Sequence, residues 1–232
     1  MKARLVGAVV AGVLVLTAGC ASTPPPTVQT GPNAEVTVDG LYRVDNSVMA
    51  LAYIKPDMDL RGYTKFLLDP VTVAYQKDPQ GRRTARAGGE QNFALRPEQM
   101  ENMKTMFRET IEKALVDDGG YELVDTPGPD VLRITAELLD LIVRVPTDGG
   151  SGFNRTYARS YGEVTMLLEL RDSESGEILA RVADRRDPTV NPGNQVTQVS
   201  PSAVRADTQR LFSYWANLLR QRLDEVRAIE PQ

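Results

Sequence analysis

Two features of its composition limit the chemistry that this chain of 232 residues can perform: it has one cysteine and no histidine. Cys20 directly follows the small residues Thr17-Ala18-Gly19, which come after a charge-free apolar run from Leu5 to Leu16. A positive start, a short apolar run and small residues before the cut are typical of an export signal; a bilayer span takes about 20 apolar residues. A cysteine at the first mature position can carry a diacylglyceryl thioether. The sequence therefore predicts lipidation at Cys20; the alternative is a buried or free thiol after ordinary cleavage.

The amino terminus as a whole resembles a bacterial lipoprotein precursor. Ala21 stands where lipoproteins retained at the inner membrane typically have aspartate, which favours the outer membrane with the domain facing the periplasm. The run Pro24-Pro25-Pro26 favours an extended linker. We therefore expect a signal peptide at 1–19, a lipidated cysteine with a proline-rich linker at 20–33, and a single α+β domain at 34–232.

The absence of histidine removes whole classes of enzyme. It excludes Ser-His and Cys-His nucleophile pairs, histidine metal ligands and the usual general base at neutral pH. No phosphate-binding loop pattern occurs in the sequence. A hydrolase could still use two carboxylates, but no pair among the 31 acidic residues is marked by the sequence. We expect no catalytic residue, no metal site and no cofactor.

The net charge of the mature chain limits the classes of partner that it is expected to bind. Removal of Lys2 and Arg4 with the signal peptide leaves 25 basic and 31 acidic side chains, a net charge of −6. An acidic protein disfavours non-specific contact with nucleic acid, so we expect no nucleic-acid partner. The expected contacts are the membrane, through the anchor at Cys20, and a protein of the cell envelope.

Two polar segments are candidates for a binding surface. The first candidate lies just before the first clear strand and consists of Asp57, Asp59, Arg61 and Tyr63. Polar residues on a loop beside a sheet often form binding sites. They are equally well explained as turn formers that hold the amino-terminal arm against the domain.

The second candidate is Asp184, Arg185 and Arg186, in a mixed-charge segment at the end of a strand. Arginines there could dock a partner through paired hydrogen bonds. The alternative is that these charges protect an exposed sheet edge from pairing with another chain.

Hydrophobic periodicity predicts the elements that hold these residues. Strands are expected at 65–75, where Pro70 indicates an edge, a bulge or a break, and at 121–124 and 131–145, followed by an antiparallel hairpin over 157–187. Pro97 opens a helix that ends at Gly119-Gly120, and a second helix covers 202–229. The apolar stripe of the second helix consists of Leu211, Trp215, Leu218, Leu219, Leu223 and Val226.

This order of elements predicts an α+β fold of two layers. We expect a mostly antiparallel or mixed sheet of about five strands, with two amphipathic helices on one of its faces.

Several short motifs resemble an uncharacterised family of Gram-negative lipoproteins, domain of unknown function 3313. They are Asp39-Gly40-Leu41, Lys55 to Tyr63, Leu67 to Val71, Gly120-Tyr121, Asp130-Val131-Leu132, and Asp172 to Ala180 with Asp184. The resemblance implies an envelope location and no activity. Our interpretation is a non-enzymatic binding or scaffolding lipoprotein of the outer membrane; the alternative is a carboxylate-dependent hydrolase of cell wall or lipid.

Overall fold

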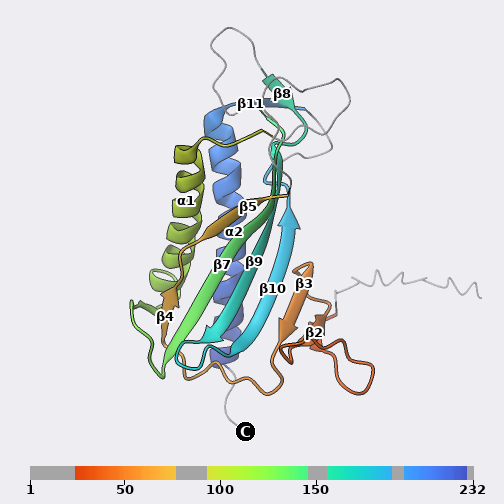
Figure 1. Cartoon of the computed structure of the whole chain (residues 1–232), viewed down its shortest axis with the longest axis vertical. Helices are drawn as coiled ribbons and strands as arrows, with labels where there is room; N and C mark the ends of the chain where they lie inside the picture. Colours follow the sequence, from red (N-terminus) through yellow and green to blue (C-terminus); the bar gives the residue numbers. More distant parts are fainter. Residues whose placement is uncertain (1–23, 77–92, 146–155, 190–195, 229–232) are drawn as a thin grey trace, which may run out of the picture.

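The structure, a computed structural model, describes residues 24–76, 93–145, 156–189 and 196–228. A large twisted sheet forms one layer and two long helices form the other (Figure 1). The helices are α1 (Pro97–Val116) and α2 (Pro201–Ala228). The strands are β1 (Thr27–Val28), β2 (Tyr42–Asp45), β3 (Leu51–Ile54), β4 (Lys65–Leu68), β5 (Thr72–Tyr75), β6 (Glu122–Leu123), β7 (Val131–Val143), β8 (Thr156–Ala158), β9 (Gly162–Asp172), β10 (Ile178–Arg186) and β11 (Thr197–Val199).

The main sheet is mixed and has nine strands. Its order is β1-β2-β3-β10-β9-β7-β4-β6, with β5 also paired to β7, and β8 and β11 form a separate two-stranded sheet. β4 and β5 run parallel to β7, β6 runs parallel to β4, and the other neighbours are antiparallel. The α+β class and the mixed sheet are confirmed. The expectation of about five strands was wrong, because β1, β2 and β3 have four residues or fewer, too short to show a clear period of two, and the strand expected at 65–75 is divided into β4 and β5.

Of the alternatives that the sequence leaves open at Pro70, the structure shows a break. β4 ends at Leu68 and β5 starts at Thr72, and both pair with β7 in the same direction. Proline has no N–H to donate to the ladder, so the strand is interrupted there and resumes two residues later.

Both helices begin where the sequence indicates. Pro97 and Pro201 occupy the first helical turn, where a missing N–H costs nothing. Ser200 Oγ accepts a hydrogen bond from the N–H of Ala203 at 3.1 Å, which caps α2. After α1 the chain turns at Gly120, whose φ of 67° favours glycine. Among the described residues, neither helix is both long and apolar enough to cross a membrane.

The two helices lie side by side on one face of the sheet, as expected (Figure 1). Their contact is centred on three aromatic rings. Phe107 of α1 meets Phe212 of α2 edge-on, with ring centroids 4.8 Å apart, and Trp215 stacks on Phe212 at 6.1 Å. Aromatic pairs at such distances add about 0.5–1.5 kcal/mol to the burial of their area. This aromatic cluster fixes α2 relative to α1.

A bulge divides β7 into two parts. Its pairing with β9 shifts register between Leu139 and Ile142, and Asp140 has a positive φ of 51°. Before the bulge the core-facing residues are Leu132, Ile134, Ala136 and Leu138; after it they are Leu141 and Val143. The extra residue moves the alternation by one position, so that both parts of β7 turn hydrophobic side chains to the helices.

Residues 24–50, which we call the amino-terminal arm, lie at the opposite edge of the sheet from β6. β1 pairs with β2, so Thr27 and Val28, within the segment expected to be a linker, are part of the sheet. Asp39 accepts a hydrogen bond from Arg181 of β10 at 2.8 Å. The arm is therefore attached to the domain by strand pairing and by an ion pair.

Candidate ligand pocket

The apolar stripe of α2 is only partly covered by the rest of the protein. Leu211, Trp215 and Leu223 are buried against the sheet and α1. Leu218, Leu219 and Val226 belong to the same stripe but remain half-buried. The uncovered part of the stripe faces a pocket.

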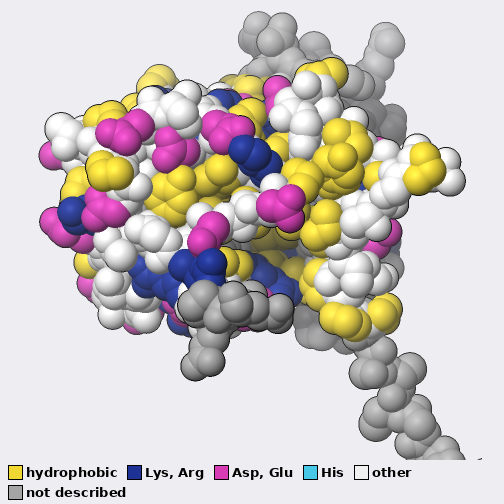
Figure 2. Space-filling model, turned by 90° about the horizontal axis from the view of Figure 1, so that it is seen from below, with side chains coloured by type: hydrophobic (Ala, Val, Ile, Leu, Met, Phe, Trp, Pro, Cys, Tyr) yellow, Lys and Arg dark blue, Asp and Glu magenta, His cyan; other side chains and the backbone are white. Residues whose placement is uncertain are grey.

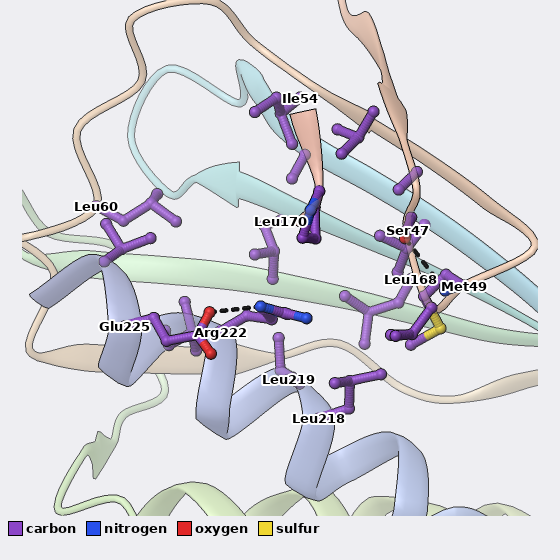
Figure 3. A pocket seen from close by; sticks show the side chains of 18 of the residues that line it. Ser47, Met49, Ile54, Leu60, Leu168, Leu170, Leu218, Leu219, Arg222 and Glu225 are labelled. Carbon is purple, nitrogen blue, oxygen red and sulfur yellow. Dashed lines mark hydrogen bonds and ion pairs between the residues drawn. The ribbon is translucent and has the colours of Figure 1, made fainter. Parts of the chain in front are cut away.

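This pocket has a volume of about 240 Å³ and lies between α2 and the inner face of the sheet (Figure 3). On the sheet side it is lined by Met166, Leu168 and Leu170 of β9, Ala180 and Val182 of β10, and Ala52 and Ile54 of β3. Across from them stand Leu218, Leu219 and Leu223 of α2. The amino-terminal arm closes a third side with Val44, Ser47, Val48 and Met49.

The lining is almost wholly hydrocarbon. Ser47, Arg222 and Glu225 are the polar or charged side chains among the described lining residues, apart from the indole N–H of Trp215. Arg222 donates to Glu225 at 2.6 Å, and the two side chains are 45% and 61% exposed, so they lie at the rim. Figure 2 shows hydrophobic side chains gathered around a hollow with charged side chains along its edge. The pocket is an apolar cavity with a polar mouth.

Its size restricts what fits. Ligand sites for drug-sized molecules hold about 300–1,000 Å³, whereas an apolar cavity of about 150 Å³ takes a benzene ring. A volume of about 240 Å³ lies between these values. The pocket therefore suits a small apolar group.

Asp184 holds one part of the pocket wall, Trp215, in place through a hydrogen bond. Its carboxylate is 4% exposed and accepts hydrogen bonds from Trp215 Nε1 at 2.8 Å and Arg186 Nε at 2.6 Å. A third donor, the N–H of Ala50, reaches it at 3.3 Å. The charge of Asp184 raises the pKa of Arg186, mainly through the hydrogen bond between them. Asp184 thus joins α2, β10 and the amino-terminal arm.

The structure divides the charged segment that the sequence singles out. Asp184 and Arg186 lie on the side of α2, where Arg186 also stacks on Tyr214 at 4.8 Å. Arg185 points to the other face of the sheet and pairs with Glu163 at 2.7 Å. The three side chains do not converge on one site.

The other polar candidates are also dispersed. Asp59 and Arg61 pair with each other at 2.8 Å, and the hydrogen bond from Arg61 lowers the pKa of Asp59 to about 2. Asp57 is in a turn with a φ of 59°. The hydroxyl of Tyr63 donates to Asp172 at 2.9 Å, which attaches this segment to the β9–β10 hairpin.

The same segment contributes to the pocket through residues that sequence reasoning passed over. Met58 and Leu60 line the pocket, and they alternate with Asp57, Asp59 and Arg61. Alternating polar and apolar residues are the signal of a chain with one face against a core. That signal was present in Asp57 to Arg61, but it spans only five residues.

The described carboxyl groups with a clearly shifted pKa all shift in the same direction. Each one whose pKa is clearly shifted has it lowered by hydrogen bonds or by a nearby cation, as in Asp59, Asp69, Asp130, Glu163 and Asp172. A general acid needs the opposite shift. Within the described ranges, no three metal-binding side chains come together. Cys20 lies outside the described residues.

A comparison with protein families shows to which family this chain belongs. A family described as "Protein of unknown function (DUF3313)" matches residues 39–219. The chain belongs to the DUF3313 family. A search of curated proteins finds no match.

Three solved structures are distantly similar to this DUF3313 protein. The PelC dodecamer from Paraburkholderia phytofirmans has 10% identity and a TM-score of 0.36, covering 72% of this chain and 96% of its own. A "putative lipoprotein" from Caulobacter crescentus CB15 has 12% identity and a TM-score of 0.33, covering 55% and 85%. A "putative neuraminyllactose-binding hemagglutinin homolog" from Helicobacter pylori has 8% identity and a TM-score of 0.37, covering 73% and 87%. At these values the likeness carries no argument about function.

Proposed function

We propose that this DUF3313 protein is a lipoprotein of the outer membrane whose periplasmic domain binds an apolar ligand in the pocket beside α2. The export signal ending at Cys20 supports the anchor, and Ala21 supports the outer membrane. A protein partner in the envelope, acting as donor or acceptor of the ligand, belongs to the same proposal.

The observation that carries the proposal is the uncovered part of the α2 stripe. Burying apolar surface stabilises a fold by about 25 cal/mol per Å², so a chain gains by closing such a gap. Here Leu218, Leu219 and Val226 face Ile54 and Val182 across an open cavity instead of packing on them. A ligand that fills the cavity would supply the missing contacts.

The hydrolase alternative has less support. It needs an acid and a base or nucleophile in one pocket, and the only carboxylate lining this pocket is Glu225 at its rim, among the described residues. Asp184 is nearby, but its two oxygens are occupied by Trp215, Arg186 and Ala50. The pocket can hold an apolar group, and it offers that group no pair of carboxylates.

Binding of N-phenyl-1-naphthylamine, a neutral apolar fluorophore, tests the proposal. The protein should enhance its fluorescence saturably at one site per chain. Leu219→Trp, which fills the pocket, should lower the affinity at least tenfold. Val204→Trp is the matched control, because Val204 is a half-buried residue of α2 outside the pocket. Equal binding by both variants, with unchanged melting temperatures, would contradict the proposal.

The anchor has its own test. Cells expressing the protein should incorporate labelled palmitate into it, and Cys20→Ala should abolish the label and leave an unprocessed or soluble form. A mature amino terminus at any other residue, seen by mass spectrometry, would contradict lipidation at Cys20.

A further inference from the structure

We infer that the pocket receives the acyl chain of a fatty-acid anion, with the carboxylate at the mouth beside Arg222. This inference rests on the proposed function and names the class of its ligand. It has three supports: the shape of the pocket, the chemistry of its interior and the arrangement of its mouth.

The pocket is long. Trp215 and Val226 both line it, and eleven residues along a helix correspond to about 16 Å. An extended hydrocarbon chain that lies along α2 would contact the apolar lining from one end to the other.

The interior excludes polar ligands. A sugar, a nucleotide or a peptide backbone would lose its hydrogen bonds to water, at about 2–7 kcal/mol for each unpaired group. No polar side chain deep in the described lining is available to replace them, because the indole N–H of Trp215 is held by Asp184. Three methionines, Met49, Met58 and Met166, give walls that adapt to a flexible chain.

The mouth offers one cation, and that cation can be exchanged. Arg222 is the only basic residue among the described lining residues, and its partner Glu225 is 61% exposed. Exposed ion pairs contribute only about 0–1 kcal/mol, so an incoming carboxylate can replace Glu225 at little cost.

Trp215 provides the reporter for the test, since it is the only tryptophan and lines the pocket. The mature chain, residues 20–232 with Cys20→Ser, is titrated with brominated stearate below its critical micelle concentration. Bromine quenches tryptophan on contact, so Trp215 emission should fall saturably. Unbranched fatty acids from octanoate to stearate should compete, each added methylene tightening binding about fourfold until the pocket is full.

The outcomes separate the inference from the function on which it rests. If phenylnaphthylamine binds but brominated stearate neither quenches nor competes, the inference is wrong and the proposed function stands. If neither binds, both fail. Quenching by vesicles of brominated phosphatidylglycerol as strong as by stearate would overturn the inference in favour of membrane lipid. Binding to the Cys20→Ser form but not to the lipidated protein would overturn it in favour of the protein's own anchor.

The mouth is tested with a matched pair of ligands. Arg222→Ala should weaken binding of palmitate about two- to fivefold and leave hexadecanol, which has the same chain and no charge, unchanged. Glu225→Gln should strengthen palmitate binding by a similar factor, because it removes the competing carboxylate. Equal effects on palmitate and hexadecanol, or none on either, would contradict the placement of the carboxylate.

Discussion

The inner face of the sheet has two parts that differ in how they are covered. Where both helices cover the sheet, Ile134 of β7, Phe107 of α1 and Phe212 of α2 are completely buried in one core cluster. Beside the amino-terminal arm, Ile54 and Val182 are only half-buried and look onto the pocket. The first part is sealed by α1 and α2 together, whereas the second has α2 on one side and a thin arm on the other.

Simple dimensions explain the difference. Eight strands in the main path, at about 4.8 Å spacing, extend over about 34 Å. Two helices, each about 10 Å across, cover about 20 Å of that width. A sheet of this size therefore outgrows two helices, and the uncovered strands become either an exposed face or a cavity. In this protein the arm converts them into a cavity.

The largest expected effect is the difference in free energy of unfolding between side-chain truncations in the first part and in the second part. Phe107→Ala removes a fully buried ring and should lower the free energy of unfolding by about 3–5 kcal/mol. Leu219→Ala enlarges an existing pocket and should cost only about 1 kcal/mol. Urea denaturation of both variants measures the contrast. Equal losses would show that the second part is as tightly packed as the first.

The junction between the two parts depends on Asp184. Asp184→Ala leaves Trp215 Nε1 buried without an acceptor and frees the arm at Ala50, at a cost of about 2–4 kcal/mol. Its effect should also reach the pocket, seen as a red shift of Trp215 emission and weaker binding of phenylnaphthylamine. Arg186→Ala is the control, because it removes the counter-charge of Asp184 and the contact with Tyr214 but keeps the acceptor of Trp215 Nε1, and it should leave the emission maximum in place.

Ion pairs on the outer face of the sheet should make the stability of the fold depend on pH. They should not change the difference in stability between truncations in the two parts of the inner face. Hydrogen bonds from Arg144 and then Arg185 lower the pKa of Glu163. A carboxyl with a lowered pKa stabilises the fold above its unfolded pKa of about 4.3, and this stability is lost as pH falls through the folded value. Stability should therefore decline by less than about 1 kcal/mol per such group below about pH 4. Glu163→Gln should show a correspondingly smaller decline.

Measurements of unfolding at neutral and at acidic pH also test the contrast between the two parts of the inner face. Because these ion pairs lie on the outer face, the difference between Phe107→Ala and Leu219→Ala should be the same at pH 7 and near pH 4. A difference that shrinks with acid would mean that the outer charges hold the pocket open.

The sequence was informative where the elements are long. The stripe of α2, the helix opening at Pro97 and the interruption at Pro70 are confirmed, because each involves a long periodic segment or a backbone restriction. β2 and β3 were missed within 34–62, because four residues give too few positions for a period. Their pairing with β10 is a long-range contact that local propensity does not encode.

The pocket could be seen from sequence only in part. The stripe predicted on α2 contains Leu218, Leu219 and Val226, but its periodicity does not tell which members lie under α1 and which face a gap. That division depends on the width of the sheet and on where the arm crosses it. The polar candidates drew attention for their chemistry, and their own neighbours Met58 and Leu60 were the residues at the pocket.

The bulge at Asp140 has a consequence for tolerance to deletions. Loss of one residue elsewhere in a strand moves all following side chains to the wrong face, and β7 already contains one such shift. Deleting Asp140 would place Leu138 and Leu141 two positions apart, so regular alternation would keep Leu141 and Val143 on the core face. The bulge is therefore the place in β7 where the loss of one residue disturbs the core least, and a one-residue gap in an alignment of relatives is expected there.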